Sequence, residues 1–138
     1  MRKLALLAAA AAAALLTMVA PAWAGSPHFV DGTVQATVDG TTLTVTGKEA
    51  GLGDELQAHV TATATAQCRN PGGNDPQAGN KQSFTAAGDF PVMNGKLYFS
   101  LDLAATFQPS CSPPMTVVWL SPVVVTDETN GITTTVSL

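Results

Sequence analysis

Two cysteines are the most reactive side chains of this 138-residue chain. Cys68 opens the stretch CRNPGGNDPQAGNK, and Cys111 lies in the proline-rich stretch QPSCSPPM. The pair could form a disulfide, bind a metal as thiolates, or supply a catalytic nucleophile. Neither cysteine has further metal ligands or a nearby base at a recognisable spacing. A disulfide is therefore expected if the chain is exported, and closing this loop would stabilise a fold by about 4 kcal/mol.

The histidines and acidic residues form no recognised catalytic pattern. His28 and His59 are the two histidines, and the chain contains neither G-x-S-x-G nor H-E-x-x-H. His59 lies in a predicted strand, with no positioned partner in that strand to make it a general base. The adjacent acids Asp54-Glu55 and Asp127-Glu128 would point to opposite faces of a strand, unlike the paired carboxylates of glycosidases. We therefore expect no catalytic residues and no enzyme.

The segment from residue 69 to residue 81 has two interpretations. Its prolines force the preceding residues to be extended, its glycines let the chain fold back, and its Asn and Asp side chains cap backbone groups. An ordered turn explains these features without a ligand, but loops of this length are often functional. A calcium site is disfavoured because the segment offers one carboxylate, so we expect no metal and no cofactor. The candidate binding residues are Arg69, Asn70, Gly72, Gly73, Asn74, Asp75, Asn80 and Lys81.

The N-terminus has the pattern of a secretory signal peptide. Arg2 and Lys3 precede an apolar run at residues 4–20, and Ala22-Trp23-Ala24 provides a cleavage pattern before Gly25. The apolar run is slightly short for a membrane-spanning helix. We predict a signal peptide at residues 1–24 and a secreted, extracellular domain at residues 25–138, with no stable membrane anchor after cleavage.

The charge of the predicted domain argues against nucleic acid as a partner. Removing Arg2 and Lys3 leaves four basic residues against ten acidic ones, a net charge of −6 with histidine neutral. The four basic residues are scattered, whereas a protein that binds the phosphate backbone needs a basic patch.

Alternation with a period of two residues dominates the predicted domain. In residues 56–68 the even positions are apolar, from Leu56 through Val60 to Cys68, and the odd positions are Gln, His and Thr. Successive strand residues point to opposite faces, so we expect buried even positions and more exposed odd ones. The same alternation recurs at residues 33–38, 42–46, 96–103 and 132–136.

Turn signals separate these runs and complete the fold prediction. Asp39-Gly40, Asn94-Gly95 and Asn130-Gly131 are hairpin-type dipeptides. The chain should be all-β, a single antiparallel β-sandwich of immunoglobulin-like architecture. The immunoglobulin Cys-Trp-Cys signature is absent, because Trp119 follows both cysteines. Residues 115–126 are apolar at both parities, as in a strand buried on both faces or one that bulges and changes sheet at Pro122.

The chain resembles a group of small exported actinobacterial proteins of unknown function. The resemblance rests on C-x-N-x-G-G-x-x-P-x-x-x-N-K, beginning at Cys68, on LTVTGKEAGLGDE before it, and on the later CSPPM. It implies export, a single β domain and a paired cysteine, and it brings no activity.

Three functional classes follow from these features. A non-catalytic binding module for an unknown extracellular protein, peptide or envelope component is favoured. A structural or self-associating secreted protein is the alternative, because threonine ladders pair well across strands. A hydrolase is the least favoured class.

Overall fold

The structure is a computed structural model that describes residues 25–72 and 80–138. The predicted signal peptide lies outside the described residues. The described chain forms eight strands and no helix, so no helix in this part of the chain could cross a membrane. The strands are β1 (His28–Phe29), β2 (Gln35–Asp39), β3 (Thr42–Ala50), β4 (Gln57–Arg69), β5 (Lys81–Pro91), β6 (Leu97–Ala104), β7 (Thr116–Asp127) and β8 (Ile132–Val136).

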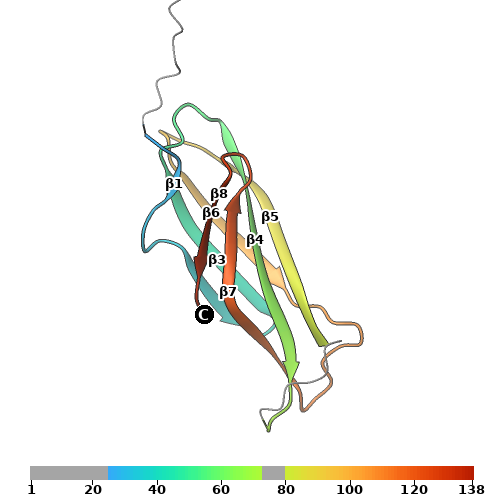
Figure 1. Cartoon of the computed structure of the whole chain (residues 1–138). Coiled ribbons are helices and arrows are strands. Elements are labelled where there is room, and N and C mark those ends of the chain that lie inside the picture. Colours follow the sequence, from blue (N-terminus) through green and yellow to red (C-terminus); the bar gives the residue numbers. More distant parts are fainter. Residues whose placement is uncertain (1–24, 73–79) are drawn as a thin grey trace, which may run out of the picture.

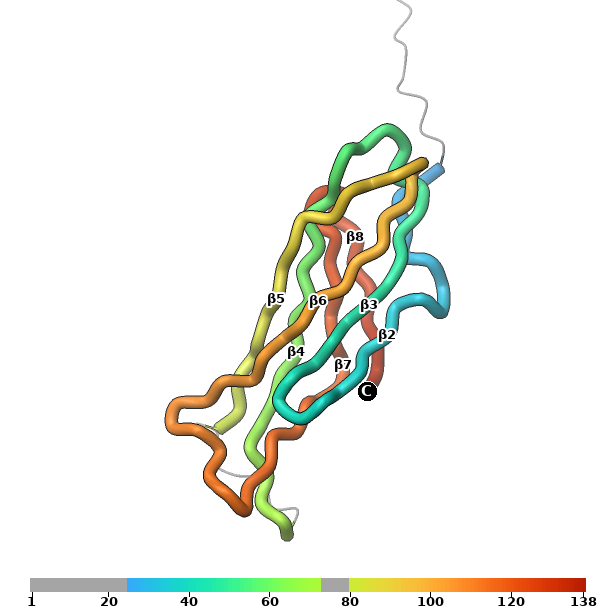
Figure 2. Tube along the Cα trace, turned by 180° about the vertical axis from the view of Figure 1, so that it is seen from behind, coloured from blue at the N-terminus to red at the C-terminus, as the bar shows by residue number. Residues whose placement is uncertain are grey.

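The strands form two antiparallel four-stranded sheets, consistent with a β-sandwich (Figure 1). In the first sheet β3 pairs with β6 along one side and with both β1 and β2 along the other. The second sheet has the order β5-β4-β7-β8. It lies in front of the first sheet in Figure 1 and behind it in Figure 2. The all-β prediction with antiparallel sheets is confirmed.

The core combines small residues of β4 with large residues of the facing sheet. Ala58, Ala62 and Ala66 are fully buried on β4, and together with Val60 they belong to the same apolar cluster as the leucines of β3 and β6. Small side chains on one sheet leave room for large ones on the other, which keeps the interior close-packed. Gly47 of β3 makes room within its own sheet, because a Cβ atom there would lie 2.5 Å from the ring of Phe99, its partner on β6.

The predicted alternation of β4 holds except at its two ends. The even positions from 58 to 68 are buried, and Thr61, Thr63 and Thr65 are more exposed. Leu56 was expected to be buried but is 86% exposed, because β4 begins after it and no part of the opposite sheet covers it. Gln67 was expected to be exposed but is buried between Lys81 of β5 and Val118 of β7.

Hydroxyl groups pair across strands on the outer face of the second sheet. Thr63 lies 2.9 Å from Thr85 of β5 between their Oγ1 atoms, and Thr65 lies 3.2 Å from the Ser83 hydroxyl. Such cross-strand pairs each contribute a few tenths of a kcal/mol up to about 1 kcal/mol. The threonine face is therefore a row of weak local contacts.

Strand β7 bulges but stays in one sheet. Its pairing with β4 shifts register opposite Thr63 and Thr65, around the segment that contains Pro122. Because proline cannot donate to the ladder, a bulge accommodates it. β7 pairs with β4 on both sides of this point, so the predicted change of sheet is wrong. Trp119 is 6% exposed and belongs to the core, as expected.

The three predicted hairpin dipeptides occupy turns. Gly40, Gly95 and Gly131 all have positive φ, and Asn94 has a φ of 54°. These left-handed conformations carry little steric cost for glycine and are tolerated by asparagine. Asp39-Gly40 and Asn130-Gly131 join paired strands and help to fix their register. Asn94-Gly95 instead turns the chain from β5 in one sheet to β6 in the other, so the prediction of a hairpin between paired strands is wrong there.

The assignment of faces on β4 gives a first testable prediction. Val60→Asp should lower the free energy of unfolding by several kcal/mol, because it places an unpaired charge in the core. Thr63→Lys replaces a residue on the outer face and should cost under about 1 kcal/mol. Urea denaturation of both variants measures the difference. Equal midpoints would contradict the assignment.

Candidate functional site

A disulfide closes the lower end of the molecule in Figure 1. Cys68 lies near the end of β4, and its bond to Cys111 joins β4 to the connection between β6 and β7, with a Cα–Cα distance of 5.7 Å. The predicted pairing is confirmed. Because the bond lies at the strand end, it fixes an end of the sheets rather than crossing their middle.

A pocket of about 560 Å³ lies beside this disulfide. It opens between the β2–β3 turn at Gly40-Thr41 and the β6–β7 connection, and its apolar wall comes from Ala105, Phe107, Met115 and Val117. A volume of this size suits a small ligand or a large side chain of a partner.

Aromatic rings support the pocket wall from behind. Phe107 packs edge-to-face on Phe84, with ring centroids 5.4 Å apart, and Phe84 packs in the same way on Trp119 at 5.8 Å. Backbone contacts add to this support, because Ala105 donates a hydrogen bond of 2.9 Å from its N–H to the Thr41 carbonyl oxygen. Each edge-to-face pair contributes about 0.5–1.5 kcal/mol beyond area burial. The pocket is thus built on packed elements.

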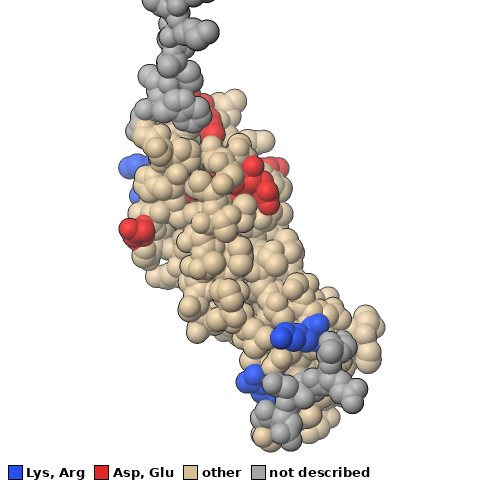
Figure 3. Space-filling view, in the orientation of Figure 1, with Lys and Arg blue, Asp and Glu red and all other residues tan. Residues whose placement is uncertain are grey.

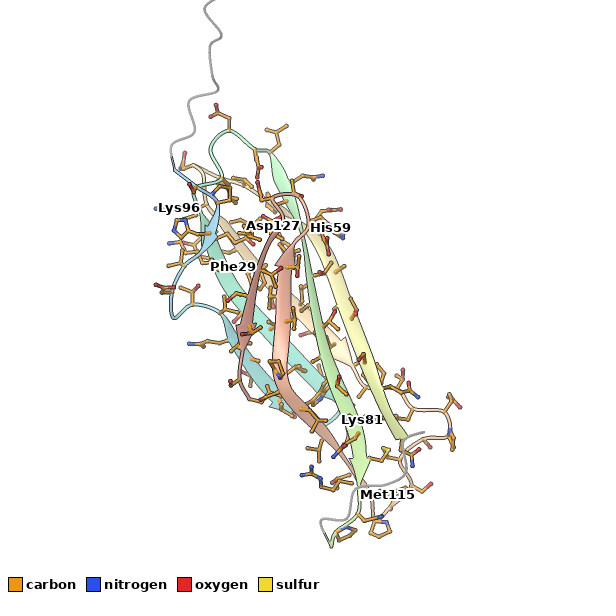
Figure 4. The ribbon with its side chains drawn as sticks, in the orientation of Figure 1. Phe29, His59, Lys81, Lys96, Met115 and Asp127 are labelled. Carbon is orange, nitrogen blue, oxygen red and sulfur yellow. A yellow bond between two sulfur atoms is a disulfide. The ribbon has the colours of Figure 1, made fainter. Side chains whose placement is uncertain are left out.

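The described residues of the predicted binding segment do not contribute to the pocket. Arg69 is the last residue of β4. Lys81, labelled in Figure 4, is the first residue of β5 and pairs with Gln67 of β4. Asn70 and Gly72 are exposed, and Asn80 is half-buried. Gly73, Asn74 and Asp75 lie outside the described residues. The pocket is lined on the Cys111 side, and none of residues 69–72, 80 or 81 lines it.

His59 has a partner that the sequence did not reveal. Its Nδ1 atom lies 2.8 Å from Oδ1 of Asp89, directly opposite on β5. Both side chains are about half exposed, so the pair contributes at most about 1 kcal/mol to stability. The neighbouring Thr61 hydroxyl donates to Glu128 at 3.2 Å, away from the imidazole. The partner of His59 comes from the neighbouring strand β5, whereas the expectation from the sequence concerned partners only within its own strand.

Polar side chains meet at the opposite, upper end of the molecule. Oδ1 of Asp127 accepts hydrogen bonds from the backbone N–H groups of Thr129 (2.8 Å) and Asn130 (3.1 Å). The Asn130 side-chain amide donates to Oδ2 of Asp127 at 2.6 Å and to Oε2 of Glu55 at 3.0 Å. These contacts close the β7–β8 hairpin and tie it to the β3–β4 loop. Figure 4 shows Asp127 at this end, and Figure 3 shows acidic side chains over the upper half.

Glu49 completes this acidic cluster from inside the core. Its side chain is fully buried, and neither carboxylate oxygen has a hydrogen-bond partner among the described residues. Burial, together with the neighbouring carboxylates of Asp127 and Glu55, raises the pKa of Glu49 to about 8. Two ionised carboxylates cannot hydrogen-bond to each other, because neither carries a hydrogen. A protonated Glu49 carboxyl group can donate a hydrogen bond to the Asp127 carboxylate. The acidic cluster, here Glu49, Glu55 and Asp127, therefore holds an extra proton at neutral pH.

The sequence contained a signal for this cluster that was missed. On β3 the inward positions run Leu43, Val45, Gly47 and Glu49, so the apolar alternation continues directly into an acid. On β7 the buried positions Val123 and Val125 lead in the same way to Asp127. An acid in phase with a buried face is costly unless it is compensated. Extending each alternation by one step would have identified both residues.

The described residues contain no group of His, Cys, Asp and Glu side chains arranged to hold a metal ion. No protein family, curated protein or solved structure matches the chain.

The raised pKa of Glu49 gives a second prediction, for a chain in which residue 24 still precedes Gly25. Between about pH 4.5 and pH 8 the unfolded chain has lost the Glu49 proton and the folded chain retains it. The free energy of unfolding therefore falls as the pH rises through this range. Glu49→Gln removes this loss, so its stability gain over the wild type should grow from pH 4.5 to pH 8 and then level off.

Urea unfolding at several pH values measures this gain. Glu128→Gln is the matched control, because Glu128 is exposed and its replacement should give a gain that barely changes with pH. A Glu49→Gln gain that is independent of pH would contradict the assignment.

Proposed function

We propose that this chain is an exported, non-catalytic binding protein whose pocket beside the disulfide receives an apolar side chain of an extracellular protein or peptide. The observation that carries this proposal is the pocket of about 560 Å³ with its wall of Ala105, Phe107, Met115 and Val117. A partner that fills it would bury apolar surface, which is the main source of affinity at protein interfaces.

The support of the pocket favours binding. The disulfide fixes the Cys111 side, and the Ala105–Thr41 hydrogen bond fixes the β2–β3 turn against the β6–β7 connection. A pocket held in this way loses little conformational entropy when it is filled. Exposed hydrophilic residues, among them Thr106 and Ser110, rim the apolar wall. An apolar centre with a polar rim is the usual anatomy of a recognition surface.

Export and an immunoglobulin-like architecture belong to the same proposal. The order β2-β3-β6 facing β5-β4-β7-β8 supports an immunoglobulin-like domain, since such domains face a sheet with strands A, B and E against a sheet with strands C, F and G. A disulfide is compatible with an oxidising compartment, as the predicted cleavage after Ala24 requires. The resemblance to small exported actinobacterial proteins remains a prediction.

The pocket predicts a specific set of perturbed methyl groups. Titration with N-acetyl-leucinamide, as a probe for an aliphatic side chain, should shift the methyl resonances of Ala105, Met115 and Val117 in ¹³C-methyl spectra. Thr106→Trp places a large ring at the exposed mouth and should abolish these shifts. Thr133→Trp, on the exposed face of β8, is the matched control and should leave them intact. Shifts spread over the whole surface, or shifts that survive Thr106→Trp, would contradict the proposal.

Self-association through strand addition is a second candidate, favoured by the edge of the second sheet. β5 pairs with β4 along its length, and its 11 residues form the outer strand of this sheet. Between Lys81 and Asp89 this edge carries no charge, and charges are a common protection of edge strands. Sedimentation velocity over a concentration series separates the two candidates. A monomer at high concentration excludes self-association, whereas a dimer that Ala87→Lys abolishes would support it.

A further inference from the structure

The acidic cluster at the upper end lacks a compensating positive charge. Asn130 is its side-chain donor, and one amide group serves both Asp127 and Glu55. Both oxygens of the fully buried Glu49 are without a hydrogen-bond partner among the described residues. The charges that act on Glu49 are those of Asp127 and Glu55, and both are negative. Because a buried charge is costly unless it is paired, a cation at this cluster would stabilise its ionised carboxylates.

No salt bridge joins a lysine of the described residues to the acidic cluster. Nζ of Lys48 lies over the Tyr98 ring, 5.2 Å from its centroid. Lys96 lies at the same upper end but is exposed at the surface, and Lys81 lies at the opposite end of the molecule (Figure 4). His28, paired with Ala50 beside Glu49, is also exposed, and its Nδ1 atom lies 2.7 Å from the Ser26 carbonyl oxygen. A cation for the buried carboxylates would therefore come from another part of the chain or from solution.

The start of the described chain lies beside this cluster. Gly25, Ser26 and Pro27 line one hollow together with Asn130, the residue that bonds Asp127 and Glu55. Further along, Phe29 is paired in register with Glu49.

Gly51 allows the N-terminal segment to lie close against the β3–β4 loop. Any Cβ atom on Gly51 would overlap the Ser26 carbonyl oxygen, so the N-terminal segment can lie close against the β3–β4 loop only because residue 51 is glycine. A Cβ atom on Gly25 would itself lie 3.6 Å from the Gly51 Cα atom. The N-terminal segment therefore lies against the β3–β4 loop, and Gly25 shares a hollow with Asn130, whose side-chain amide contacts Glu55 and Asp127.

We propose that the α-ammonium group of Gly25, created when the chain is cut after Ala24, enters this hollow and pairs with the carboxylates of the acidic cluster, of which Glu49 and Asp127 are fully buried and Glu55 is half-buried. The inference rests on the cleavage proposed above. A processing peptidase adds water across the bond between residues 24 and 25, which leaves a carboxylate on Ala24 and an amine on Gly25. That amine takes up a proton from water at neutral pH, because its ordinary pKa is about 7.7–8.0.

Cleavage after Ala24 would then change the charge at the upper end of the molecule. Before cleavage the Gly25 nitrogen is an uncharged amide, and the acidic cluster retains its extra proton. After cleavage a positive charge at the same place stabilises the ionised carboxylates. The cut chain is therefore held more firmly at this end than the uncut one.

Two chains that differ by one residue test this inference. Residues 25–138 carry the ammonium group on Gly25, whereas residues 24–138 carry it one residue away and leave an amide at Gly25. At pH 7 the equilibrium constant for unfolding should be at least about tenfold smaller for 25–138. Glu49→Gln should shrink this ratio strongly, and the exposed-site control Glu128→Gln should preserve it. Equal stability of the two chains, or a ratio unchanged by Glu49→Gln, would overturn the proposal.

A direct titration and a mass measurement complete the test. The pKa of the Gly25 amine in 25–138, followed by NMR, should lie above its ordinary range, and an amine that titrates normally would overturn the pairing. The intact mass of protein secreted by its host tests the cleavage separately. A start at any residue other than Gly25 would overturn the native role of this amine, even if the two recombinant chains differ in stability.

Discussion

The register of β4 is the constraint on which the rest of the structure depends. This strand pairs with β5 along one side and with β7 along the other, and its inward alanines set how closely the two sheets approach. A slip by one residue would exchange the alanine face for the threonine face. The same register places Cys68 inward at one end of β4, where the disulfide forms, and leaves Leu56 beyond the other end.

Electrostatic interactions matter most where the apolar alternation of the strands ends. β3 and β7 both end their buried faces on an acid, Glu49 and Asp127, at the same end of the sheets. Asp127 is satisfied by its own hairpin, through the N–H groups of Thr129 and Asn130. Glu49 has no such turn, and its neighbours are themselves acidic. Its burial is therefore explained by a proton or by a cation supplied from elsewhere.

Much of the fold could be predicted because it depends on local rules. Alternation identified the buried faces of β4 and β6, and Asp39-Gly40 and Asn130-Gly131 identified two hairpins. The disulfide followed from cysteine count and expected compartment. The errors have a different origin. Whether Leu56 or Gln67 is covered depends on which other strand lies over it, and one sequence does not contain that information.

The sites were harder to predict for the same reason. The pocket beside Cys111 is built from the β2–β3 turn and the β6–β7 connection, whose approach follows from sheet order rather than from any motif. His59 and Asp89 meet because β4 and β5 pair in one particular register. The glycine-rich segment after Cys68 attracted attention by composition alone, and its described residues do not line the pocket. Composition marks a loop, but it does not say what lies next to it.

The two ends of the molecule are held by different kinds of interaction. At the lower end a covalent bond joins β4 to the β6–β7 connection, and edge-to-face aromatic pairs pack behind it. Neither the disulfide nor the aromatic packing changes with pH over the range in which the protein is folded. At the upper end the hairpin of β7 and β8 is tied to the β3–β4 loop through one asparagine and two carboxylates. Charge governs that end, so protonation or a new terminal amine can alter its stability while the pocket at the other end keeps its shape.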